Sequence, residues 1–204
     1  MELMKSYRLR DKEGEKMKKF ELTAEYVTNI FGKKLFRIKA LVEFGNVKEG
    51  DLGGFVEKES NIDDDGNAWV SGNAQVFGNA KISGNAQVYG NAKVFGNAWV
   101  FGNAWISGNA QVYGNACVAE NLDYAIVGGF GSEQQTITFF CQKDGTVGVK
   151  CGCFYGTLEE FREKVKKTHK DSKYAQEYLM IADLMELHFA GGCDGNDKDN
   201  HSCL

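Results

Sequence analysis

Histidine is the residue type that would most clearly indicate catalysis or zinc binding in this chain, so we consider its positions first. The only histidines are His169, His188 and His201, all late in the sequence. A general base for acyl transfer, or a zinc site built from three imidazoles, needs histidine at the site. Residues 66–119, the most regular stretch of the chain, contain none. We therefore expect no catalytic residue and no cofactor there, and we predict that the protein is not an enzyme.

A zinc site is the second candidate, with Cys141, Cys151, Cys153 and His169 as its ligands. Thiolate and imidazole are ligands that zinc prefers. However, one residue separates Cys151 from Cys153, whereas zinc-binding pairs are usually separated by roughly two to four. A buried cysteine more often packs as a small apolar side chain. We predict that Cys141 and Cys151 are buried and free of metal.

Three consecutive carboxylates, Asp63-Asp64-Asp65, could bind a cation, since hard cations prefer oxygen ligands. They lack the spaced ligands of a calcium loop, so we favour a solvated loop inserted between two structural repeats. Cys193, His201 and Cys203 could also chelate a metal. They lie in residues 190–204, which are rich in Gly, Asp and Asn, and we predict that this tail is disordered. No metal site is predicted.

The elements that position these residues are organised around residues 66–119, where the phrase Gly-Asn-Ala-x-(Val/Ile)-x occurs nine times without a gap. A strict short period with one aliphatic residue in each unit predicts a solenoid, in which every unit buries one side chain and stacks on its copies. Gly-Asn makes the bends because both residues tolerate positive φ. An aliphatic residue followed four places later by a small one resembles the hexapeptide-repeat family of left-handed β-helices. That resemblance implies a triangular coil made of three hexapeptides.

A coil of three hexapeptides sorts the repeats onto three faces, each named by its inward column. Face one has Val76, Val94 and Val112; face two has Val70, Val88 and Ile106; face three has Ile82, Val100 and Val118. The residues beside each inward aliphatic point outward. Eight of these 18 outward positions are aromatic: Phe77, Phe95 and Tyr113 on face one, Trp69, Trp105 and Tyr89 on face two, and Trp99 and Phe101 on face three.

So many outward aromatic residues predict that something covers them. A symmetric second copy is the commonest cover, and terminal segments that fold back over the faces are the alternative. Since its side chain points outward, Phe95→Glu is expected to leave the coil folded and to disrupt the contact. All eight aromatic residues are therefore candidate interface residues.

Charge and hydropathy limit the classes of partner and the cellular location that the sequence predicts. The net charge is −4, and residues 66–119 contain Lys81 and Lys93 but no acid, which is too little positive charge for a phosphate backbone. Nucleic acid is therefore not the expected partner. The chain has no apolar run of membrane-spanning length. Its first residues, Met1 to Lys19, lack the apolar core of a secretory signal. Six cysteines without a signal predict reduced thiols and a cytoplasmic protein.

The remaining sequence divides into caps around the solenoid. Residues 1–17 are predicted to be flexible. Residues 18–65 form an N-terminal cap and a first irregular coil, with a short strand at Phe20 to Thr23 and a hairpin in which Ile30-Phe31 and Leu35 to Ile38 flank Gly32. The irregular coil is expected to cover the open end of the solenoid, so that its strand edges cannot pair with other chains.

Residues 120–189 form a C-terminal α+β module. It opens with a linker from Glu120 to Ser132 and continues with a hairpin over 136–151. Only a three-residue loop, with Gly145 left-handed, puts the apolar set on one face, and it pairs Cys141 with Val147, Phe139 with Val149 and Ile137 with Cys151. Thr157 to Glu160 reads as a capping box that opens a helix, and a second helix runs from about Tyr174 to His188. The predicted fold is mainly β: a left-handed parallel β-helix with an N-terminal hairpin cap and a small C-terminal module of one β-hairpin and two helices.

Two longer stretches resemble known proteins. Phe44 to Val56, followed by Gly-Asn-Ala repeats, resembles the opening of YdcK-like β-helix proteins of bacteria. The same opening, with Lys150 to Phe154 and Thr157 to Phe161, is similar to hypothetical proteins of phages and prophages. The resemblance implies a phage-borne protein in a host cytoplasm and assigns no functional residue.

The resulting hypothesis is a non-enzymatic, oligomeric interaction protein. The expected partners are further copies of this chain, which would form a homo-oligomer, and a host protein complex. That complex could be a defence complex such as CRISPR. The alternatives are a hexapeptide acyltransferase-like enzyme, a binder of single-stranded nucleic acid or of a signalling nucleotide, and a structural part of a virion.

Overall fold

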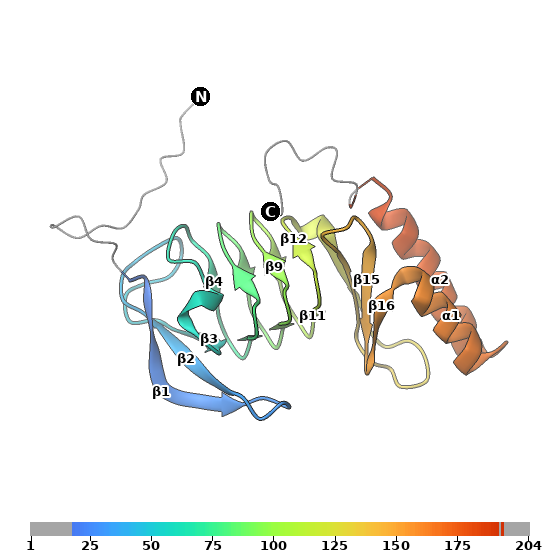
Figure 1. Cartoon of the computed structure of the whole chain (residues 1–204), viewed down its shortest axis with the longest axis horizontal. Helices are drawn as coiled ribbons and strands as arrows, with labels where there is room; N and C mark the ends of the chain where they lie inside the picture. The colour runs from blue at the N-terminus through green and yellow to red at the C-terminus, as the bar shows by residue number, and fades with distance from the viewer. Residues whose placement is uncertain (1–17, 192, 194–204) are drawn as a thin grey trace.

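The structure is a computed structural model, and it describes residues 18–191 and 193. A solenoid of about four coils forms its middle. An N-terminal hairpin lies at one end, and a four-stranded sheet covered by two helices lies at the other (Figure 1). The predicted mainly β architecture with terminal caps is confirmed. The hand of the winding stays a prediction.

The solenoid strands are two residues long, each formed by the aliphatic residue of a repeat and the residue before it. They are β4 (Trp69–Val70), β5 (Gln75–Val76), β6 (Lys81–Ile82), β7 (Gln87–Val88), β8 (Lys93–Val94), β9 (Trp99–Val100), β10 (Trp105–Ile106), β11 (Gln111–Val112) and β12 (Cys117–Val118). Each pairs in parallel with the strand three repeats along, as Val76 does with Val94. Face one contains β5, β8 and β11, face two β4, β7 and β10, and face three β6, β9 and β12. The predicted coil of three hexapeptides and its three columns are confirmed.

The interior is filled by the aliphatic residue and the alanine of each repeat. Val76, Val94 and Val112 have no exposed surface, and neither do the neighbouring Ala80 and Ala92. Removing each valine side chain from water contributes about 1.5 kcal/mol or more. Since the side chains alternate along each strand, burying the aliphatic residue forces the preceding residue outward.

The corners of the coils are held by asparagine side chains that stack from one coil to the next. The Nδ2 of Asn67 donates to Oδ1 of Asn85 at 3.0 Å, and Asn85 donates in the same way to Asn103 at 3.1 Å. Asn73 and Asn91 begin a second ladder, at 3.3 Å. Each amide thus satisfies the next, which explains why the repeat keeps asparagine after every glycine.

The N-terminal cap is a hairpin of β1 (Phe20–Thr28) and β2 (Lys34–Ala40), followed by β3 (Leu52–Val56) and the short 3-10 helix η1 (Glu59–Asn61). The predicted hairpin is therefore wrong in its first strand, because β1 extends to Thr28 and Ile30-Phe31 lies in the turn. The physical reason is Asn29. Its Oδ1 accepts hydrogen bonds from the main-chain nitrogens of Phe31 and Lys33, at 2.9 and 3.0 Å, and so closes the turn earlier.

The predicted first irregular coil is confirmed. Strand β3 pairs in parallel with β5, with Val56 opposite Val76. Ile62 bridges to Ile82. Both pairs lie slightly further apart in the sequence than the pairs within the solenoid, because the stretch around Asp63-Asp64-Asp65 lengthens this coil.

Lys19 lies beneath this coil and is fully buried. Its Nζ donates to the main-chain oxygens of Asp63, at 2.6 Å, and Ala68, at 3.0 Å. It also lies 4.9 Å from the centre of the Phe44 ring. The ammonium group therefore satisfies carbonyl groups that the end of the solenoid would otherwise leave unpaired.

The C-terminal sheet is antiparallel and has four strands: β13 (Tyr124–Val127), β14 (Ile137–Cys141), β15 (Val147–Cys151) and β16 (Phe154–Thr157). The predicted register is confirmed, with Cys141 opposite Val147 and Phe139 opposite Val149, and Gly145 has a φ of +81°. The predicted linker over 120–132 is wrong, because it contains the 3-10 helix η2 (Asn121–Asp123) and β13, which pairs with β14.

Two helices cover the sheet, α1 (Leu158–His169) and α2 (Lys173–Phe189). The capping box is confirmed: Thr157 Oγ1 accepts from the Glu160 nitrogen at 3.2 Å, and Glu160 Oε2 accepts from the Thr157 nitrogen at 2.7 Å. The buried side of α2 includes the predicted Tyr178, Ile181 and Met185.

Strand β14 joins the two parts of the molecule, because it is buried on both faces. Phe139 belongs to the core beneath the helices, whereas the next residue, Phe140, belongs to the core of the solenoid. Thr138 Oγ1 accepts a hydrogen bond from the Gln111 nitrogen at 2.9 Å. The last coil is therefore capped by a strand of the C-terminal sheet.

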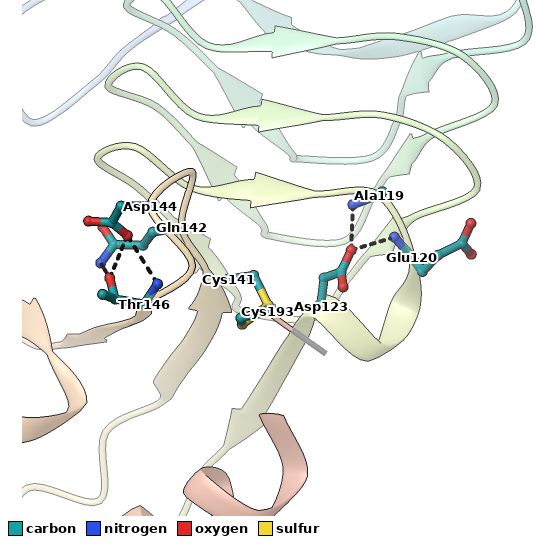
Figure 2. The surroundings of a disulfide bond; sticks show 8 residues. All are labelled: Ala119, Glu120, Asp123, Cys141, Gln142, Asp144, Thr146 and Cys193. Carbon is teal, nitrogen blue, oxygen red and sulfur yellow. Dashed lines mark hydrogen bonds between the residues drawn. A yellow bond between two sulfur atoms is a disulfide. The ribbon is translucent and has the colours of Figure 1, made fainter. Parts of the chain in front are cut away.

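The cysteines differ from the sequence expectation. Cys141 is buried as predicted, but it forms a disulfide with Cys193, which joins the segment after α2 to β14 (Figure 2). Cys117 is disulfide-bonded too. The interpretation of all six cysteines as reduced thiols is therefore wrong, and so is a disordered tail at Cys193. The other predicted tail residues and the flexible residues 1–17 lie outside the described residues, apart from Ala190 and Gly191.

The close stacking of the coils can be tested with two glycines. Gly84 and Gly32 both have positive φ, at +65° and +75°. A Cβ at Gly84 would lie 3.1 Å from the Gly102 nitrogen, whereas nothing lies within 4 Å of a Cβ at Gly32. Gly32→Ala should cost only the backbone term of about 1–2 kcal/mol. Gly84→Ala should cost at least about 1 kcal/mol more. Urea unfolding followed by circular dichroism measures both, and equal losses would contradict close stacking.

The disulfide closes a loop with a sequence separation of 52 residues. Opening it in Cys193→Ser should lower the free energy of unfolding by about 2–4 kcal/mol, because the unfolded chain gains conformational freedom. Cys153→Ser is the control, since Cys153 is a free, exposed cysteine. Urea unfolding without reductant should separate the two variants. Equal stability would show that the bond contributes nothing.

Candidate functional site

The aromatic column on face one is covered by the chain itself. Phe77, Phe95 and Tyr113 stack with ring centres 4.8 and 4.4 Å apart. Phe31 of the β1–β2 turn lies over Phe77 and Phe95, at 6.1 and 6.4 Å. Tyr155 of β16 packs against Tyr113 at 4.7 Å. Phe77 and Phe95 are only 6% and 9% exposed, so the alternative of terminal segments folding over the column describes this face.

Trp69 of face two is also buried within the chain. It packs edge-on against Phe20 of β1, with ring centres 6.4 Å apart, and against Phe44 at 5.4 Å. On face three, Trp99 and Phe101 lie 4.7 Å apart, and Phe101 is buried.

The surface that stays open lies on face two, next to the C-terminal module. Trp105 is 54% exposed and Tyr89 is 39% exposed, the highest values among the eight aromatic residues. Ile126 of β13 is 38% exposed, and Tyr124 is half-buried. These four side chains line a hollow of about 310 Å³. We call Tyr89, Trp105, Tyr124 and Ile126 the face-two patch.

The backbone beneath the patch is fixed by η2 and β13. Strand β10 lies at the edge of its sheet. Its Trp105 nitrogen donates to Asn121 Oδ1 at 2.8 Å, and its Trp105 carbonyl accepts from the Tyr124 hydroxyl at 2.7 Å. Both edge groups are thus satisfied by side chains, which fixes the backbone that carries the indole ring. Sequence reasoning missed Tyr124 and Ile126, although their alternation with Ala125 was a signal for a strand.

A second hollow, of about 380 Å³, lies on face three between η1 and Trp99. Its walls are charged, with Glu59, Asp63 and Asp64 near Lys81. The indole nitrogen of Trp99 already donates to Ser83 Oγ at 3.0 Å. This hollow therefore differs from the face-two patch in its charged walls.

The groups that could do chemistry are not brought together on the solenoid. His169 lies between α1 and α2, with its ring 5.4 Å from that of Tyr178. Burial raises the pKa of the Cys151 thiol, which disfavours the thiolate, and Cys151 is half-buried rather than buried as predicted. Burial also lowers the pKa of Lys150 beside it. Within residues 18–191 and 193, no group of three or more His, Cys, Asp or Glu residues is arranged to hold a metal ion.

The fold and this surface define a β-solenoid protein with an open aromatic patch on its second face. Residues 74–90 and 86–102 match the family model of the YdcK beta-solenoid repeat. Both segments lie within the solenoid, and the resemblance to YdcK-like repeats is confirmed for them. No curated protein matches the chain. In the described part of the chain, no helix is long and apolar enough to cross a membrane.

The covering of face one can be tested by comparing how a charge at a covered and at an exposed aromatic residue changes the free energy of unfolding. The expectation that a charge at Phe95 leaves the coil folded assumed an exposed side chain, whereas Phe95 is buried between two rings. Phe95→Glu should lower the free energy of unfolding by about 3 kcal/mol or more, since it buries an unpaired charge. Trp105→Glu should change it by about 0.5 kcal/mol or less, as surface substitutions do. Urea unfolding compares them, and equal effects would contradict the covering of face one.

Proposed function

We propose that this protein is a non-enzymatic scaffold that binds a protein partner through the face-two patch. One observation carries the proposal: of the eight outward aromatic residues, Trp105 and Tyr89 are the two exposed by more than a third. The chain covers most of the others with its own terminal segments and leaves this group open. Tryptophan and tyrosine are also the residues that contribute most to protein interfaces.

The chemistry of the patch suits a protein better than a nucleic acid. Its side chains are apolar or neutral, and Gln87 and Ser107 are its near neighbours on face two. The two lysines of the repeats, Lys81 and Lys93, lie on faces three and one. Stacking on a base without cations to hold phosphate would give weak binding. A protein partner with an apolar contact residue needs no such cations.

The patch is also preorganised. Trp105 has its backbone nitrogen and carbonyl held by Asn121 and Tyr124. A rigid aromatic side chain loses little conformational entropy on binding. The hollow beside it can therefore receive a side chain of the partner without a change in the solenoid.

The resemblance to phage and prophage proteins makes a host protein complex the partner to test first, and defence complexes such as CRISPR belong to that class. The proposed setting is then the host cytoplasm. A cytosol normally keeps thiols reduced, so in that setting the Cys141–Cys193 bond should be open. The redox state of this bond in cells therefore bears on where the protein acts.

The test uses Trp105→Ala, with Phe130→Ala as the matched control. Phe130 is 45% exposed, similar to Trp105, but does not line the hollow. A partner captured from host lysate by the tagged protein is purified, and its dissociation constant is measured for all three forms. Trp105→Ala should weaken binding about thirtyfold or more, as loss of a central aromatic contact does. Equal binding by both variants, or capture of single-stranded oligonucleotides instead, would overturn the proposal.

A further inference from the structure

We propose that the outer face of the two helices, α1 and α2, binds a second copy of this chain about a two-fold axis that runs perpendicular to the helices. The helices form the outermost layer at the C-terminal end of the molecule, on the far side from the solenoid (Figure 1). The inference rests on the pattern of these helices and not on the face-two patch.

The first observation is an exposed apolar stripe on α2. Met180, Leu184 and Leu187 are 72%, 57% and 73% exposed. Their spacing of four and three residues places them on one side of the helix. The opposite side packs on the C-terminal sheet through residues such as Ile181 and Met185. An amphipathic helix normally has a single apolar side. We therefore expect another protein surface to pack on the second apolar stripe of α2.

The second observation is the order of charges along α1. Glu159 and Glu163 lie in its first half, Lys166 lies in its last turn, and Lys170 follows directly after its end; all four are exposed. A helix with this order is self-complementary when it meets its own copy in the antiparallel direction. Glu159 then lies opposite Lys170 of the second copy, and Glu163 opposite Lys166. Both pairings share one centre, midway between Glu163 and Lys166.

The third observation is that a single two-fold axis can relate α1 to its copy and α2 to its copy at the same time. The Nη2 of Arg162 contacts Asp183 Oδ1 at 3.0 Å and Glu186 Oε2 at 2.6 Å. These contacts place Arg162 beside the stretch 183–186 of α2, which runs antiparallel to α1. The centre of the two charge pairings on α1 therefore lies beside the point on α2 midway between Met180 and Leu184. A two-fold axis there packs Met180 against Leu184 of the second copy.

Charge also explains why a second copy fits this face. Asp183 and Glu186 border the stripe, and their ion pairs with Arg162 reduce the repulsion that two such helices would otherwise feel. The helices are about 18 and 25 Å long at 1.5 Å per residue. Together they offer a footprint of roughly 500 Å² per copy, below the ≈ 800 Å² of a standard interface. The dimer should therefore be reversible and sensitive to dilution and to salt.

The first experiment is sedimentation equilibrium of the full chain over a hundredfold range of concentration. The wild type should associate to a dimer, and Leu184→Glu should raise the dissociation constant at least tenfold. Ile30→Glu is the matched control, because Ile30 is 84% exposed in the β1–β2 turn, far from the helices. A wild type that stays monomeric at about 100 µM, or a dimer lost equally in both variants, would overturn the proposal.

A charge exchange tests the antiparallel arrangement itself. One variant carries Lys166→Glu and Lys170→Glu, and the other carries Glu159→Lys and Glu163→Lys. Each variant alone should associate more weakly than the wild type, because like charges then meet at both ends. An equimolar mixture should recover the wild-type dimer, since opposite charges meet again. Thermal unfolding of each variant checks its fold, and a mixture that remains as weak as its components would overturn the arrangement.

Discussion

Hydrogen bonds between each coil and the coil that follows it hold this protein together, and the rest of the molecule depends on their spacing. The Gln75 nitrogen donates to the Ala92 carbonyl at 2.9 Å, and the Phe77 nitrogen donates to the Val94 carbonyl at 3.1 Å. With strands of only two residues, these bonds form only if every corner bends alike. Glycine at positive φ and a stacked asparagine provide that bend, which is why the repeat tolerates change at the outward positions and not at these two.

A stacked solenoid has two open ends, and the way they are closed determines what its faces show. Lys19 satisfies carbonyl groups at one end, and Phe140 and Thr138 of β14 close the other. The hairpin at the first end carries Phe31 over face one, and the module at the second end carries Tyr124 to the edge of face two. Capping therefore buries one aromatic column and leaves another partly open. The candidate site is in this sense a consequence of how the solenoid ends.

The features that were predictable from sequence are those set by short periods. The coil of three hexapeptides, the first irregular coil, the Cys141–Val147 register and the Thr157 capping box all follow from alternation or from local hydrogen bonding. The failures involve partners distant in sequence. No spacing rule links Cys141 with Cys193, and none places Phe31 over Phe95. The face-two patch was half predictable, because Trp105 and Tyr89 were visible in the repeat, whereas Tyr124 was hidden in an apparent linker.

The central claim is that the chain covers most of its own outward aromatic residues and leaves Trp105 and Tyr89 open. Hydroxyl-radical footprinting with mass spectrometry measures this residue by residue on the native protein. The account predicts strong labelling of Trp105 and Tyr89, and weak labelling of Trp69, Phe77 and Phe95. Labelling of Phe77 and Phe95 as strong as that of Trp105 would contradict it.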